Sequence, residues 1–241
     1  MVMSSTFQES GSVEANAPVL RADKRKQKSP CDMFSIERPS IRYFRRGDVI
    51  ASAGTLLDSF VKVQHGIVTG STTLADGREF IIEIIPQREC FGELQVLRRK
   101  RLTLEYRAAS ECELHFYDGR NLRERHASDP ELRERLLTKA LARVSDLELR
   151  MIENAASSLQ ARLAIMLLRL ADSYGRDTPA GKEVMISQHD LAATLPASRE
   201  KVNQCLRRLR QNKVIDQAPS RGRICILDPE ALQTYAEQGS F

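Results

Sequence analysis

The sequence predicts an α+β fold with a β-rich first half and a helical second half. Between residues 38 and 118, short apolar runs alternate with turn residues, which is typical of a small antiparallel barrel or jelly roll. After Pro130 no Gly or Pro occurs before Gly175, and apolar residues recur every three or four positions, which is typical of long helices. The 241 residues are enough for two domains.

The first 37 residues follow neither pattern. They are rich in Ser, Gly, Pro and charged residues, and we expect residues 1–37 to form a disordered leader. The N-terminus lacks the basic and apolar regions of a secretory signal, and no apolar stretch approaches the ~20 residues of a membrane span. We therefore expect a cytoplasmic protein that makes no contact with a membrane.

Residues 38–125 are predicted to form the barrel. Asp76-Gly77 is a strong hairpin signal, because a type I′ turn needs a positive φ, which Gly adopts at no cost. Pro86 ends the apolar run that follows this hairpin. The predicted strands cover residues 48–50, 60–63, 67–69, 80–85, 104–108 and 113–117.

Residues 126–155 are predicted to form one long helix, with Asp129 as the N-cap and Pro130 at the first helical position. A narrow apolar seam with charged neighbours runs along it, which favours pairing with a second copy of the chain. Packing of the seam against the chain's own barrel is the alternative. The predicted dimer-interface residues are Leu137, Ala140, Val144, Leu147 and Met151.

A second domain is predicted over residues 156–230, followed by a tail at 231–241. Ser157 and Gln160 have the spacing of a capping box and would start a helix that ends near Gly175. Between residues 187 and 206, two short helices, capped by Ser187 and Ser198, are separated by Pro196. Two further strands, at 214–215 and 223–227, flank a turn at 219–222. Together these segments predict a winged helix-turn-helix, a DNA-binding structure.

The second helix of this pair is predicted to read DNA. Its apolar residues Val202, Leu206 and Leu209 share one face, so its polar residues point elsewhere. Residues 198–223 carry eight basic and two acidic side chains, a charge of +6 in a chain whose net charge is +5. The predicted DNA-binding residues are Ser198, Arg199, Glu200, Lys201, Asn203, Gln204, Arg207, Arg208, Arg221 and Arg223.

Three stretches together resemble the Crp/Fnr superfamily of transcription regulators. Phe91-Gly92-Glu93-Leu94 is similar to the motif that opens the phosphate-binding segment of its cyclic-nucleotide-binding barrel. The helix starting at Asp129-Pro130 is similar to its dimerisation helix, and residues 198–204 are similar to the start of its recognition helix. The resemblance implies base contacts by Arg199 and Glu200, with Gln204 where the family often has Arg.

The same resemblance implies an effector site in the barrel, formed here by Gly92, Glu93, Leu94, Arg101 and Thr103. The residues that contact cyclic AMP in the family are largely absent from this sequence. The register that aligns residues 106–108 places Leu102 at the position of the phosphate-binding Arg, and Leu147-Glu148 replaces the pair that contacts adenine. A cyclic nucleotide is one candidate effector, and no cofactor follows from the sequence.

The five cysteines are scattered and contain no C-x-x-C pair, which argues against a disulfide framework and a zinc site. An iron–sulfur cluster is not expected, since only Cys31 lies near the N-terminus. The four histidines have no metal-ligand spacing, so no metal site is predicted. No catalytic triad, P-loop or dinucleotide-binding motif occurs, and we predict that the chain is not an enzyme.

The sequence therefore predicts a sequence-specific transcription regulator that binds palindromic double-stranded DNA as a homodimer. The resemblance implies RNA polymerase as a further partner and control by a small effector, through rotation of the DNA-binding domains about residues 155–158. The alternative is a cyclic-nucleotide-sensing module that acts on a protein partner. The sequence does not identify the effector, the target genes or the sign of regulation.

Overall fold

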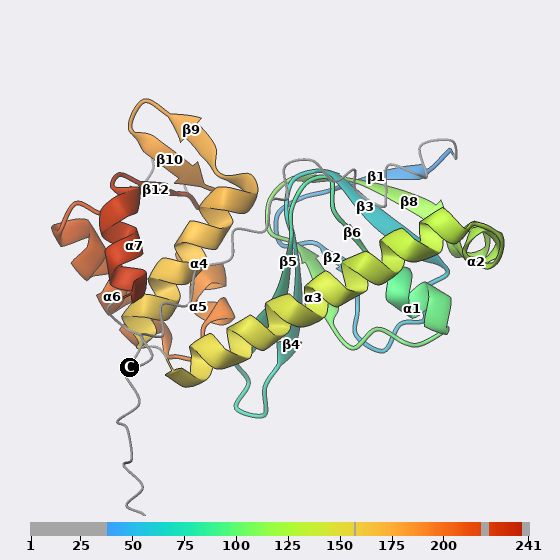
Figure 1. The fold of residues 1–241 in the computed structure, drawn as a ribbon, viewed down its shortest axis with the longest axis horizontal. Coiled ribbons are helices and arrows are strands. Elements are labelled where there is room, and N and C mark those ends of the chain that lie inside the picture. Colours follow the sequence, from blue (N-terminus) through green and yellow to red (C-terminus); the bar gives the residue numbers. More distant parts are fainter. Residues whose placement is uncertain (1–37, 157, 218–221, 238–241) are drawn as a thin grey trace, which may run out of the picture.

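The computed structural model describes residues 38–156, 158–217 and 222–237. A β-rich domain and a helical domain lie side by side, and one long helix, α3 (Pro130–Ala156), crosses the β-rich domain and leads to the helical one (Figure 1). This is the predicted order of elements. Among the described residues, no helix is both long and apolar enough to cross a membrane.

The β-rich domain, called the roll below, consists of two four-stranded antiparallel sheets. One sheet has the order β1-β8-β3-β6 and the other β2-β7-β4-β5. The strands are β1 (Ser40–Phe44), β2 (Val49–Ala51), β3 (Ser59–His65), β4 (Val68–Thr73), β5 (Glu79–Ile85), β6 (Cys90–Phe91), β7 (Glu105–Ala108) and β8 (Cys112–Asp118).

The core of the roll lies between its two sheets. The ring of Phe91 on β6 stacks on the ring of Tyr106 on β7, with 4.4 Å between their centroids. Val61 and Leu114 from the first sheet and Val68 from the second belong to the same buried cluster. The alternation of apolar and polar residues in the sequence follows from this arrangement, because only one face of each strand meets the core.

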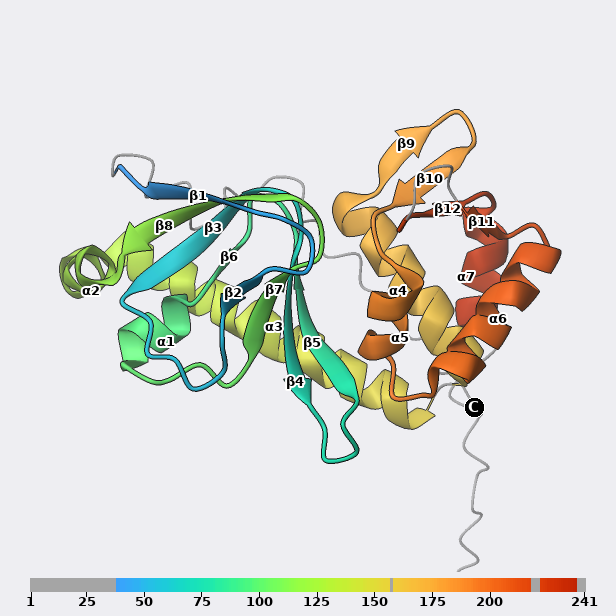
Figure 2. The same cartoon turned by 180° about the vertical axis from the view of Figure 1, so that it is seen from behind.

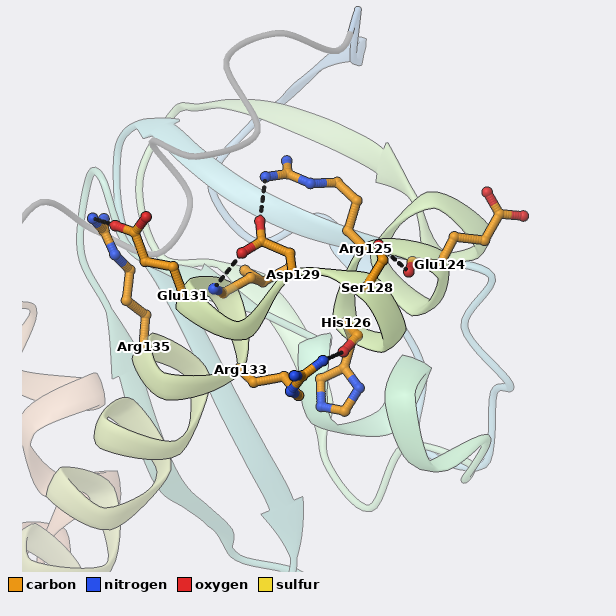
Figure 3. Close-up of polar contacts among 9 residues, drawn as sticks. Glu124, Arg125, His126, Ser128, Asp129, Glu131, Arg133 and Arg135 are labelled. Carbon is orange, nitrogen blue, oxygen red and sulfur yellow. Dashed lines mark hydrogen bonds and ion pairs between the residues drawn. The ribbon is translucent and has the colours of Figure 1, made fainter.

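Two short helices accompany the roll, and the second of them leads to α3. Helix α1 (Glu93–Arg98) lies between β6 and β7, and α2 (Gly119–Ser128) follows β8. The prediction of a single helix starting at residue 126 was wrong, because residues 126–128 belong to α2. The predicted cap is confirmed: the Asp129 carboxylate accepts a hydrogen bond from the Leu132 N–H at 3.0 Å. The same carboxylate also contacts Arg125, and the chain turns between the two helices at this point (Figure 3).

The helical domain contains four helices and a four-stranded sheet of order β11-β12-β10-β9. Its buried core is formed by Leu163, Leu191, Val202 and Leu206, each fully buried, together with their neighbours. The elements are α4 (Leu159–Tyr174), β9 (Arg176–Thr178), β10 (Gly181–Val184), α5 (Gln188–Thr194), α6 (Arg199–Gln211), β11 (Ile215–Gln217), β12 (Ile224–Ile226) and α7 (Pro229–Glu237).

Three predictions for this domain need correction. The predicted tail at 231–241 is wrong for its first residues, since α7 places the fully buried Leu232 in the core beside α4. The hairpin of β9 and β10 was not predicted at all. The cap of α4 is Ser158, whose Oγ accepts from the Ala161 N–H at 3.2 Å, and Ser157 lies outside the described residues. The predicted leader also lies outside them.

Cys90 is disulfide-bonded, although the scattered cysteines of the sequence argue against a disulfide framework. Cys112, Cys205 and Cys225 are free. Burial raises the pKa of each of these three thiols, which keeps them protonated at neutral pH. No group of three or more metal-ligating side chains occurs in the described parts of the chain.

The two domains touch through α5 and β5, which lie next to each other in both views (Figures 1 and 2). Ile84 of β5 packs against the core of the helical domain. The His189 imidazole of α5 lies 3.5 Å from the Glu79 carboxylate of β5. Asp190 lies 3.5 Å from Arg46 of the roll. Helix α5 therefore contacts both the roll and α6.

Candidate DNA-binding site

The site is built on α5 and α6, two helices whose starts are fixed by serines. The Ser187 Oγ accepts a hydrogen bond from the Asp190 N–H at 3.1 Å and caps α5. The Ser198 Oγ accepts from the Lys201 N–H at 3.4 Å and caps α6. Between them Pro196 lies in the turn, since α5 ends at Thr194. Both predicted caps are confirmed, and each satisfies an N–H of the first turn that has no partner within its helix.

Helix α6 is anchored by one face. Val202, Leu206 and Leu209 are fully buried in the core of the helical domain, as predicted from their spacing. Every other side chain of α6 is at least partly exposed to solvent. The side chains of Arg199, Glu200, Lys201, Gln204, Arg207 and Arg208 are exposed, and Asn203 is half-buried.

The exposed side of α6 has the chemistry for contact with DNA. Arg can donate two hydrogen bonds to guanine, and Asn or Gln can pair with adenine in the major groove. Arg199, Lys201 and Arg208 form no ion pair with any described residue, so their charges are available to an anion. Glu200, in the first turn, lies near the positive end of the helix.

Two residues missed by the sequence interpretation join this surface. Gln188 of α5 and Arg210 of α6 line a shallow hollow of about 270 Å³ together with Asn203 and Arg207. The hollow lies between the two helices and presents only polar side chains. Gln188 directly follows the N-cap of α5. Its position at the start of the first helix of the pair could have identified it from the sequence as part of this surface.

The wing follows α6, and one of its two predicted DNA-binding arginines is paired within the protein. Strands β11 and β12 pair antiparallel, which confirms the predicted hairpin. However, the Arg223 guanidinium donates to the Glu183 carboxylate of β10 at 2.6 Å and is only partly exposed. Its charge is therefore balanced within the protein. Arg221 lies outside the described residues.

The predicted effector residues differ in their exposure and in their contacts. Gly92 has a φ of 88° and starts α1, and Glu93 is buried and paired with Lys139 of α3. Leu94 and Thr103 are exposed. Arg101 is also exposed, and its guanidinium donates to the Gly54 carbonyl at 2.9 Å. Leu102, at the predicted position of a phosphate-binding Arg, is buried in the roll.

Both halves of the chain match known protein families. Residues 41–129 match the cyclic nucleotide-binding domain, and residues 161–235 match the Crp-like helix-turn-helix domain. The second match covers α5, α6 and the wing described above. The chain belongs to the Crp/Fnr superfamily of transcription regulators.

Known relatives of this Crp/Fnr protein agree with that assignment. It is 27% identical over 165 residues to a CRP-like cAMP-activated global transcriptional regulator of Mycobacterium tuberculosis, covering 68% of this chain and 74% of the relative. It is 24% identical over 196 residues to the global nitrogen regulator of Synechococcus elongatus, covering 80% and 87%. These relatives are regulators and not enzymes.

Solved structures show the same fold. A CRP-family transcriptional regulator of Thermus thermophilus has a TM-score of 0.70 at 24% identity, over 83% of this chain and 98% of the other. FixK2 of Bradyrhizobium japonicum has a TM-score of 0.71 at 17% identity, over 82% and 96%.

Helix α3, which crosses the roll (Figure 1), carries an exposed apolar face. Leu137, Val144 and Met151 are more than half exposed, and Leu147 is also exposed. Ala140, the remaining predicted seam residue, is half-buried. The sequence interpretation missed Leu141 and Ile152, which are 58% and 62% exposed and extend the same face.

Proposed function

We propose that this Crp/Fnr regulator binds palindromic double-stranded DNA as a homodimer and reads its bases with α6. The observation that carries the proposal is the two-sided character of α6: Val202, Leu206 and Leu209 hold it in the domain, and its opposite side presents cations and amides. We assign base contacts to Arg199, Glu200 and Gln204, and phosphate contacts to the cations further along the helix.

The dimer is proposed from α3. Large apolar side chains that are exposed together usually mark a protein interface. Here they form one face of a single helix: Leu137, Leu141, Val144, Met151 and Ile152. A second copy of α3 is the natural partner, because a seam with this period packs against an identical seam. Such a dimer would present two copies of α6 to half-sites about 34 Å apart on one side of the duplex.

Regulation is proposed to act at the junction of α3 and α4. Helix α3 ends at Ala156 and α4 starts at Leu159, so rotation there would reorient α6 relative to the dimer. An ion pair between Glu153 and Arg169 spans this junction. The contact of α5 with β5 would have to separate in the same movement. The roll, residues 38–125, is the proposed effector domain, and RNA polymerase in the cytoplasm is a proposed partner.

The test of DNA reading is selection of binding sites from random duplex DNA at about 0.15 M salt, where non-specific binding is weakened. We expect enrichment of a palindrome, and we expect Arg199→Ala to relax the enriched sequence at one base pair of each half-site while the protein stays folded. Enrichment of no sequence, by a protein shown to be folded, would contradict the proposal. A cyclic-nucleotide-sensing module that acts only on proteins would give that result.

The test of the dimer is the mass in solution. We expect the wild type to have twice the mass of one chain by light scattering, and the double variant Leu141→Asp/Val144→Asp to be monomeric. Leu94→Asp, at an exposed apolar residue of α1, is the matched control and should stay dimeric. A monomeric wild type would show that the apolar face of α3 has another partner.

A further inference from the structure

The start of α1 in the roll is held by a lysine from α3. The Lys139 ammonium lies 2.7 Å from the Glu93 carboxylate, 3.1 Å from the Cys90 carbonyl oxygen and 3.6 Å from the Glu89 carboxylate. Three oxygens thus face the three N–H donors of one ammonium group. Burial opposes the charge of Lys139, but Glu93 and Glu89 outweigh this effect and raise the pKa of the group.

Further cations of α3 contact the roll along the same line. Arg143 donates to the Glu83 carboxylate of β5, and Arg150 donates to the Ile82 carbonyl oxygen at 2.9 Å. Residues 139, 143 and 150 are spaced by four and seven positions, so they share one face of the helix. This face meets the roll, and the exposed apolar residues lie on the opposite side of the helix by their spacing.

Part of the roll next to these pairs is closely packed by its own side chains. At Gly70 of β4, an added Cβ would lie 3.0 Å from the Tyr106 ring and 3.2 Å from Leu104. The Tyr106 ring in turn stacks on Phe91, two residues before the start of α1. A purine base placed against β4 at this point would have to displace these residues, which is costly in a close-packed interior. The roll also has a hollow of about 410 Å³, whose lining includes Arg42, Phe91 and Phe116 but no residue of α3.

The charge of the region also disfavours a nucleotide. Glu83, Glu89 and Glu93 are the roll's charged contacts with α3, and their partners Lys139 and Arg143 are already paired. A cyclic phosphate entering here would add a negative charge beside three carboxylates or would break an ion pair. Either change is unfavourable, because a charge that is left without its partner in a buried site is strongly destabilising.

We propose that Lys139 and Arg143 hold α3 on the roll in the place of a bound cyclic nucleotide, so that the protein binds DNA without one. The two cations act as positioning residues: they fix α3, which carries both the apolar dimer face and the connection to α6. This inference rests on the proposed function, since it concerns how DNA binding is controlled.

The first experiment asks whether a cyclic nucleotide binds. Cyclic AMP and cyclic GMP are titrated into the full-length protein by calorimetry, and the affinity for the selected palindrome is measured with and without each nucleotide. We expect no saturable heat up to millimolar nucleotide and less than about a twofold change in DNA affinity. Saturable binding at micromolar concentration, or a tenfold gain in DNA affinity, would overturn the inference.

The second experiment tests the ion pair. We expect Lys139→Gln to weaken DNA binding by about tenfold, within the usual range of coupling between sites. The exchanged pair Lys139→Glu/Glu93→Lys should recover most of the affinity, and Lys139→Arg should retain it. Arg135→Gln is the matched control, because Arg135 pairs with Glu131 within α3 and not with the roll.

Circular dichroism of every variant separates a loss of positioning from a loss of folding. If Lys139→Gln unfolds, the exchanged pair and Lys139→Arg still test whether DNA binding depends on the ion pair, because both variants keep a cation opposite a carboxylate. A folded Lys139→Gln protein with wild-type DNA affinity would overturn the inference. Failure to select any DNA sequence would refute the proposed function, and the calorimetric titration would still report on the nucleotide site by itself.

Discussion

Helices α3 and α6 both carry several arginines and a lysine, but they place them in opposite situations. On α3, each of these cations contacts an oxygen of the chain itself: Arg133, Arg135, Lys139, Arg143 and Arg150 donate to carboxylates or carbonyl groups. On α6, Arg199, Lys201 and Arg208 form no ion pair with the described residues. The same residue types therefore hold the protein together in one helix and face solvent in the other.

The difference shows that a count of basic residues does not by itself predict where a protein binds an anion. What matters is whether a carboxylate of the same chain has already neutralised the cation. A phosphate can contact Arg199 without breaking an existing ion pair, whereas contact with Arg143 would separate it from Glu83. Arg223 of the wing behaves like the α3 residues because of Glu183.

The largest expected effect comes from removing one partner of the α3 pairs. Glu93→Gln leaves the Lys139 charge without its nearest carboxylate, and we expect the free energy of unfolding to fall by roughly 3 kcal/mol. Urea unfolding monitored by circular dichroism measures this change. The double variant Glu93→Gln/Lys139→Met removes both charges and should recover most of the loss. Equal instability of the single and double variants would show that the two charges are not coupled.

The caps and the buried face of α6 could be predicted from the sequence because both depend on neighbours within a few residues. Asp129 and Ser198 act on N–H groups three positions away, and Val202, Leu206 and Leu209 follow the helical period. The family resemblance gave the order of the domains. Local capping and periodicity, together with the order of the motifs, were therefore sufficient to predict the fold class and the position of α6 in the sequence.

The pairing of α3 with the roll could not be predicted in this way. Glu93 lies 46 positions before Lys139 in the chain, and no local pattern connects them. The side of α3 that faces outward was also ambiguous, because Ala140 and Leu141 are both apolar and the sequence does not say which one meets the roll. Only the position of the roll decides that Leu141 is exposed.

A pH effect is expected in the roll at alkaline pH. Burial, and secondarily the nearby Glu93 carboxylate, raise the pKa of Tyr106 to about 12, so the folded state retains a proton that the unfolded chain loses near pH 10. Stability from this group is complete below about pH 10 and is lost as the pH rises toward 12, by up to roughly 3 kcal/mol. Tyr106→Phe should remove this part of the pH dependence in urea unfolding. An unchanged slope in that variant would contradict the assignment.

A change on α6 should affect DNA binding and leave stability unaltered, in contrast to the α3 changes. We expect Arg199→Ala to weaken binding to the selected palindrome by about 1–3 kcal/mol and to relax specificity at one base pair of each half-site. Its melting temperature should stay that of the wild type, because Arg199 is exposed and unpaired among the described residues. Arg120→Ala, at an exposed arginine of α2, is the control and should retain DNA affinity. A melting temperature that falls together with the affinity would mean that Arg199 supports the fold and not the readout.

The smallest expected effect is a change in salt dependence. If Arg208 binds a phosphate, Arg208→Ala should weaken binding to all DNA sequences alike and should reduce the slope of log K against log salt by about one for each phosphate that is no longer neutralised. Arg135→Ala should leave the slope unchanged, because that arginine is paired with Glu131 and releases no counterion from DNA. The slope is measured from binding titrations at several salt concentrations. Equal slopes for the wild type and Arg208→Ala would mean that this exposed cation of α6 lies away from the DNA backbone, and that the absence of an ion pair is necessary but not sufficient for phosphate binding.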